Sequence, residues 1–149
     1  MVTVPVQVSE ELLLPVSVVR AWEYLGDTAR MVELDPLLES YEPEGGVISQ
    51  GTTNRVVSRL GPLRIRMVTR TTVLDPPHRV VFENVTPGWP LRVRTEDVLL
   101  EHREGALYRV TSTVRGRGPI GLLLARPVAR QMMRTRRQLM ERVRQELAE

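Results

Sequence analysis

The chain has 149 residues, of which 42% are hydrophobic and 26% charged, a composition typical of one globular domain spanning residues 1–149. It has no cysteine, which excludes disulfides, thiolate metal sites and cysteine nucleophiles. All 21 basic residues are arginine, so lysine chemistry is excluded. The net charge of +3 is mild, whereas a nucleic-acid-binding domain usually shows a denser basic patch. No stretch reaches the roughly 18 apolar residues that span a bilayer, and no signal peptide is evident. We therefore expect a cytoplasmic protein with no nucleic-acid partner and no stable membrane insertion.

The N-terminal quarter predicts one strand and two short helices. Valines alternate along residues 2–10, which is the period of a strand. A helix then begins at Pro15 or Ser17 and ends at Gly26. A second helix, capped by Asp27, ends before the next proline, Pro36.

The middle of the chain predicts an antiparallel sheet. Strand-like patterning and turn signals alternate, with strands expected at 37–43, 51–60, 63–74, 79–86, 91–102 and 106–117. In the last of these, Tyr108, Val110, Ser112 and Val114 oppose polar or charged residues, as expected for one covered and one wetted face. His78 follows an Asp-Pro-Pro turn signal, so we interpret it as a turn residue and not as an acid–base group.

The tail from residue 118 predicts a long amphipathic helix. We expect Pro127 to break it into a short piece and a main helix of about 20 residues. The face opposite its apolar stripe carries Arg126, Arg130, Arg134 and Arg137. The element order predicts an α+β fold in which a curved antiparallel sheet of about seven strands wraps around this helix, with two short helices after the first strand.

Three segments resemble the START-like, or SRPBCC, superfamily, and in particular its polyketide cyclase/dehydrase-like branch. They are PVSVVRAWEYLGDTARMVELDP (15–36), VLDPPHRVVFENV (73–85) and EGALYRVTSTVRGRGPIGLLL (104–124). The first resembles a Pro-led helix carrying a Trp and then an Asp, the second an Asp-Pro-Pro turn between long strands, and the third the approach to the terminal helix. The resemblance implies a helix-grip fold with a cavity between the concave sheet face and the C-terminal helix. Because the superfamily holds both carriers and enzymes, the fold does not fix the function.

We predict that ten side chains bind a ligand in this cavity: Met67, Phe82, Trp89, Arg94, Glu96, Tyr108, Met132, Arg136, Leu139 and Met140. The methionines suit a bulky apolar ligand, although methionine also fills gaps in an ordinary core. Trp89 lies in a loop that borders the cavity in this family, where it acts either as a lid or as an aromatic packed on the sheet edge.

The charged side chains among these ten residues each allow two interpretations of where they point. Arg136 lies near Val143 on the helical wheel, so its guanidinium either holds a ligand carboxylate or phenolate, or reaches solvent over an apolar stem. Arg94 and Glu96 share the strand parity of the apolar residues that follow them. They form either an inward pair or an outward one followed by a bulge.

The sequence shows no HExxH, GxSxG or phosphate-binding motif, and His78 and His102 make a poor metal site, so we predict no catalytic residue, metal or cofactor. The main hypothesis is non-covalent binding of a small hydrophobic molecule, such as a lipid, a quinone or a polyketide-like compound. One alternative is a polyketide cyclase or aromatase that uses Tyr108 with Arg94 or Arg136. Another is a ribosome- or membrane-associated module that uses the arginine face, although such charge runs are usually just solvated.

Overall fold

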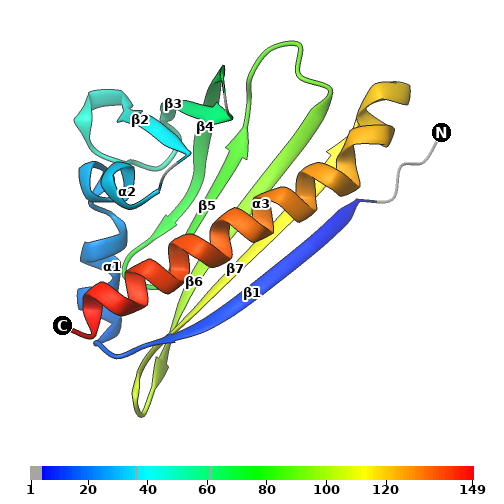
Figure 1. Cartoon of the computed structure of the whole chain (residues 1–149). Helices are drawn as coiled ribbons and strands as arrows, with labels where there is room; N and C mark the ends of the chain where they lie inside the picture. The colour runs from blue at the N-terminus through cyan, green and yellow to red at the C-terminus, as the bar shows by residue number, and fades with distance from the viewer. Residues whose placement is uncertain (1–4, 36, 61) are drawn as a thin grey trace.

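The computed structural model describes residues 5–35, 37–60 and 62–149, and it shows an open antiparallel sheet curved around one long helix (Figure 1). The strand order is β1-β7-β6-β5-β4-β3-β2. The strands are β1 (Val6–Leu14), β2 (Leu38–Pro43), β3 (Thr53–Leu60), β4 (Leu63–Asp75), β5 (Arg79–Asn84), β6 (Leu91–His102) and β7 (Gly105–Gly116). The helices are α1 (Val18–Leu25), α2 (Thr28–Leu34), the 3-10 turn η1 (Glu44–Gly46) and α3 (Gly118–Leu147). The predicted α+β helix-grip fold is therefore confirmed.

The two short helices begin at the residues that the sequence predicts. The Ser17 hydroxyl accepts a hydrogen bond from the backbone N–H of Arg20, and the Asp27 carboxylate accepts one from Arg30, both at 3.2 Å. Each cap satisfies a backbone donor that has no partner within its helix. Residues 2–4 of the predicted first strand, and the proline expected to end α2, lie outside the described residues.

The sheet buries one face against α3. As predicted, β7 turns Tyr108, Val110, Ser112 and Val114 inward, and all four are buried. The main core joins this face to α1 and to the second half of α3, and its buried members are Leu14, Val16, Val18, Ala21, Leu99, Ala106, Tyr108, Val110, Leu139, Met140, Val143 and Leu147. Because α3 packs mainly on β1 and β7, the concave side of β4, β5 and β6 remains free to line a pocket.

The break expected at Pro127 is wrong. The helix α3 continues from Gly118 to Leu147 with Pro127 inside it. Pro127 is exposed, and Leu123, whose carbonyl would have received the missing N–H, is 77% exposed. Water can therefore hydrogen-bond to that carbonyl, and losing one backbone bond there leaves no buried polar group unpaired.

Candidate ligand-binding site

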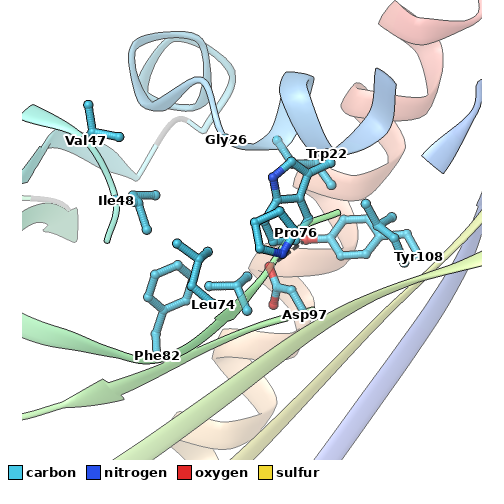
Figure 2. Close-up of a pocket in the computed structure, with 12 residues that line it drawn as sticks. Trp22, Gly26, Val47, Ile48, Leu74, Pro76, Phe82, Asp97 and Tyr108 are labelled. Atoms are coloured by element: carbon cyan, nitrogen blue, oxygen red, sulfur yellow. Dashed lines mark hydrogen bonds between the residues drawn. The ribbon is translucent and has the colours of Figure 1, made fainter. Parts of the chain in front are cut away.

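A pocket of about 300 Å³ lies between α1, the segment after η1 and the concave face of the sheet (Figure 2). Its described lining residues are Trp22, Leu25, Gly26, Val47, Ile48, Leu74, Pro76, Val80, Phe82, Asp97, Leu99 and Tyr108. Asp97 is the one charged residue among them, and most of the others are apolar. The volume is at the lower end of the range for small-molecule sites, and an apolar wall with few polar groups is the usual composition of such sites.

Asp97 and Tyr108 form the polar end of this pocket. They come from neighbouring strands, where Asp97 pairs with Val110 and Tyr108 pairs with Leu99, so the two side chains are diagonal neighbours on the inner face. The Tyr108 hydroxyl donates a hydrogen bond to Oδ2 of Asp97 at 3.0 Å (Figure 2). The other oxygen, Oδ1, is buried and accepts no hydrogen bond from the described residues. The site therefore presents a buried acceptor that is still free to receive a donor.

Arg136 approaches the same place from α3. It lies seven residues from both Ala129 and Val143, which are fully buried, so its side chain leaves the helix on the inward face. Within the described part of the chain, Arg136 forms no ion pair within 4.0 Å. Because a guanidinium has five N–H donors, it can bind a ligand oxygen here without breaking an ion pair.

The electrostatics of the site favour a charged arginine. Burial lowers the pKa of Arg136, but the nearby Asp97, Tyr108, Asp35 and Tyr41 act in the opposite direction and raise it overall. Arg136 is therefore a permanent cation beside the polar end of the pocket, and no residue of α3 is among the described lining residues.

The two tyrosines of the site stay protonated. Burial raises the pKa of Tyr108 well above its usual range, and the charge of Asp97 raises it further, against a smaller opposing effect of Arg136. Burial likewise raises the pKa of Tyr41, which β2 contributes, while a hydrogen bond with Thr69 lowers it in part. Both phenols act as neutral groups near neutral pH. We call Tyr41, Asp97, Tyr108 and Arg136 the polar cluster.

Three more polar residues lie on β3 and β4, beside Tyr41. The side-chain N–H₂ of Asn54 donates to the hydroxyls of Thr69 at 3.2 Å and Thr71 at 3.1 Å. Asn54 and Thr71 are fully buried, and Oδ1 of Asn54 has no hydrogen-bond partner among the described residues. A buried acceptor without a partner is unusual in a folded protein, so the polar character of this face extends beyond Asp97.

The structure brings together three of the ten predicted ligand-binding residues. Phe82 and Tyr108 line the pocket, and Arg136 belongs to the polar cluster beside it. Leu139 and Met140 are buried in the main core, and Met132 packs on a second cluster that contains Leu91, Val114, Ala125 and Ala129. Met67 is half-buried opposite Val56, and Trp89 is half-buried in the β5–β6 loop. None of these five lines the pocket, and their contact with a ligand remains a prediction.

Of the two orientations left open for Arg94 and Glu96, the structure shows the outward one, without the bulge. On β6 the inward face includes the buried residues Leu91, Thr95 and Leu99, and no bulge interrupts the pairing of β6 with β7. Glu96 instead accepts a hydrogen bond from Arg79 at 2.6 Å, and Arg94 is 3.9 Å from Glu83, both on the outer face. Charged side chains pair with each other there and remain in contact with water, which avoids the cost of burying them.

Sequence reasoning missed Asp97, Tyr41 and Trp22. Asp97 was not identified because the parity of β6 stayed open, although Thr95 and Leu99 flank Asp97 at the spacing of one strand face. Trp22 packs on the core and also lines the pocket. Tyr41 carried no signal, because its strand is short and interrupted by a bulge.

The histidines take no part in the pocket. His78 is exposed in the turn between β4 and β5, as predicted, where its N–H donates to the carbonyl of Asp75 at 2.9 Å. Among the described residues there is no group of three or more metal-ligating side chains. Nor does any helix in the described ranges combine the length and the apolar character needed to cross a membrane.

Comparisons with known proteins agree with this fold. The family described as polyketide cyclase/dehydrase and lipid transport matches residues 5–148. No curated protein sequence gives a significant match. Among solved structures, Ara h 8.0201 is similar with a TM-score of 0.78 at 15% identity, covering 97% of this chain and 98% of its own. TTHA0849 from Thermus thermophilus has a TM-score of 0.74 at 22% identity, covering 96% of this chain and 97% of its own.

A third similar structure is the di-domain ARO/CYC StfQ from the steffimycin biosynthetic pathway, with a TM-score of 0.77 at 15% identity. The match covers 94% of this chain and 50% of StfQ. These identities are low enough that the structural matches show the fold alone. The family match extends over nearly the whole chain, and the chain therefore belongs to the polyketide cyclase/dehydrase and lipid transport family of the helix-grip superfamily.

Proposed function

We propose that this protein binds a small amphipathic molecule non-covalently, with its apolar body in the pocket and its polar head against the polar cluster. The observation that carries this proposal is the buried Oδ1 of Asp97, without a partner among the described residues, near a guanidinium that forms no ion pair with them. A buried polar group without a partner destabilises a protein by about 1–3 kcal/mol, so such an arrangement is expected where a ligand completes it. The cytoplasmic location expected from the sequence is part of this proposal.

The side chains of the polar cluster indicate which polar groups the ligand head carries. Arg136 offers donors to a carbonyl, carboxylate or phenolate oxygen, while Oδ1 of Asp97 accepts from a hydroxyl. A ligand that carries an acceptor and a donor close together satisfies both. The remaining wall, which includes Trp22, Phe82 and Leu99, contacts rings or alkyl groups by apolar burial. An oxygenated aromatic or polyketide-like compound fits this description, and so does a quinone reduced to its hydroxyl form.

The pocket is tested with 2-naphthol as the probe and Trp22 as the reporter. A Trp89→Phe background leaves Trp22 as the single tryptophan, and its fluorescence should change on binding because it lines the pocket. Val80→Phe, which fills the pocket, should abolish the change, whereas Val19→Phe on the exposed face of α1 should not. Unchanged binding by the Val80→Phe variant would place the ligand elsewhere.

A cyclase-type enzyme is the second candidate. The observation that favours it is the hydrogen bond of 3.0 Å from the Tyr108 hydroxyl to the Asp97 carboxylate, which lies within electrostatic range of Arg136. In this reaction Asp97 takes a proton from the carbon between two carbonyls, and Arg136 stabilises the enolate oxygen that forms. The test is the rate at which benzoylacetone, a small β-diketone, enolises in ultraviolet absorbance. An acceleration lost in Asp97→Asn supports the enzyme, and no acceleration by wild-type protein contradicts it.

A further inference from the structure

The first turns of α3 reverse the usual arrangement of a surface helix. Its small residues Gly121, Ala125 and Ala129 face the protein and are buried. The large aliphatic side chains face outward, with exposed fractions of 65% for Ile120, 42% for Leu122, 77% for Leu123 and 38% for Leu124. A surface helix normally turns its apolar stripe toward the core, so this outward-facing group, which we call the apolar tip, has a different role.

Close packing holds the apolar tip outside. A Cβ atom placed on Gly121 would lie 2.4 Å from the carbonyl oxygen of Pro90 and 2.9 Å from the carbonyl carbon of Gly116. The helix therefore has no room to rotate and bury a larger residue at this position. In Figure 1 the first turns of α3 lie at the end of the helix opposite α1 and α2, and α1 is the helix that lines the pocket. Exposure of these side chains is thus fixed by the fold.

Positive charge gathers around the apolar tip. From residue 105 to residue 140 the sequence has eight arginines and no aspartate or glutamate. Arg109 pairs with Glu11, Arg137 pairs with Glu10, and Arg136 belongs to the polar cluster. The other five are exposed and form no ion pair with any described residue: Arg115, Arg117, Arg126, Arg130 and Arg134.

We propose that the apolar tip and these five arginines dock the protein reversibly on an anionic lipid surface. Aliphatic side chains enter the boundary between headgroups and acyl chains, while arginines beside them contact lipid phosphates. The β5–β6 loop adds a tryptophan, Trp89, and lies against the start of α3, because the carbonyl of Pro90 accepts from Arg117 N–H at 2.7 Å. Tryptophan favours the same interfacial layer. This inference does not depend on what the pocket binds.

The charge distribution favours lipid over the other candidate occupants. In a symmetric dimer the same patch faces itself, so the arginines of one copy would oppose those of the other. A nucleic acid would use the arginines but would leave the exposed leucines in water. An anionic membrane surface accommodates both the apolar side chains and the positive charge.

Co-sedimentation with vesicles tests the proposal. The full chain is mixed with vesicles of phosphatidylcholine alone or with about one-third phosphatidylglycerol, at low and high salt. We expect binding to the anionic vesicles that weakens as salt screens the arginines. Leu123→Glu should reduce it about tenfold or more, because it removes an inserted side chain and adds a repelled charge. Val19→Glu, on the exposed face of α1, is the matched control and should bind as wild type.

A second variant pair tests the charge. Arg126→Glu with Arg130→Glu should lose binding about tenfold or more, whereas Arg20→Glu with Arg103→Glu, equal in charge change and distant from the apolar tip, should lose much less. Circular dichroism checks that each variant is folded. Equal binding to neutral and anionic vesicles would overturn the proposal, as would Leu123→Glu binding like wild type. If the protein does not bind vesicles, the proposal is also overturned by a dimer that Leu123→Glu dissociates, or by binding to duplex DNA.

Discussion

Asp97 on β6 and Arg136 on α3 lie within electrostatic range of each other, yet they are more than 4.0 Å apart and form no direct ion pair. Tyr108 is close to both, since it donates to Asp97 and the charge of Arg136 affects its pKa. Opposite charges in an apolar site normally close such a gap, because attraction is strong where the dielectric is low. A ligand oxygen between them can accept from one residue and donate to the other.

The hydrogen bond between Tyr108 and Asp97 should contribute to stability even without ligand. Tyr108→Phe keeps the ring but leaves a second oxygen of Asp97 without its donor. We expect the free energy of unfolding to fall by about 1–3 kcal/mol, measured by urea denaturation. Tyr24→Phe is the control, because Tyr24 bonds to Glu146 at the exposed surface and should change stability less. Equal losses in the two variants would contradict the buried role of Tyr108.

Stability should fall at alkaline pH because of the tyrosines. Burial raises the pKa of Tyr41 and Tyr108, and burial with the Glu146 hydrogen bond raises the pKa of Tyr24 to about 12. Because these pKa values are higher in the folded protein than in the unfolded chain, the tyrosines of the unfolded chain lose their protons first as the pH rises. The free energy of unfolding therefore keeps the full contribution of the phenols below pH about 10 and loses it above that pH.

The composition makes this effect easy to measure. The chain has three tyrosines and neither lysine nor cysteine, so few other groups titrate between pH about 9 and 12. Urea denaturation across this range should give an unfolding free energy that falls as pH rises, with a smaller slope in Tyr108→Phe. A flat profile would show that the phenols titrate as freely in the folded protein as in the unfolded chain.

The outer face of β6 should not affect ligand binding. Glu96→Gln and Arg94→Gln change charges on the convex side, whereas Asp97→Asn changes the neighbouring residue on the concave side. We expect the affinity for 2-naphthol, followed by Trp22 fluorescence, to change by less than about twofold in the first two variants and by about tenfold in Asp97→Asn. The reverse result would mean that the strand register is shifted by one residue.

Gly121 should be essential for seating the start of α3. Gly121→Ala places a methyl group against the carbonyl of Pro90, so the helix must move from the sheet. We expect a loss of about 1–3 kcal/mol in urea denaturation. Gln131→Ala, at an exposed position of the same helix, is the control and should be within about 0.5 kcal/mol of wild type. A stable Gly121→Ala protein would imply looser packing of this end than the structure shows.

The sequence predicted the fold well because its signals are local. Ser17, Asp27 and Gly26 set the ends of the short helices through bonds a few residues away, and the alternation along β7 follows from one covered face. The break predicted at Pro127 was wrong, because the tendency of proline to break a helix is weaker at an exposed position such as that of Pro127 and Leu123.

The site was harder to predict because it depends on register and on contacts between distant segments. The parity of β6 stayed open in the sequence, and it decides between Glu96 and Asp97 because neighbouring residues point to opposite faces. Arg136 was identified because helical spacing placed it beside buried residues, a local signal. Nothing local links Tyr41 to Arg136, and only the curvature of the sheet brings them together.

Recognition of the ligand head by the polar cluster can be tested with two probes that differ only in the head. The affinities of naphthalene and 2-naphthoic acid, which share a ring system, are measured by Trp22 fluorescence in Trp89→Phe protein, with and without Arg136→Met. We expect Arg136→Met to weaken the affinity for the acid by about tenfold or more and to change the affinity for naphthalene by less than about twofold. If Arg136→Met lowers the affinity for both probes equally, or if the acid binds the variant as tightly as wild type, Arg136 does not bind the ligand head and recognition by the polar cluster is contradicted.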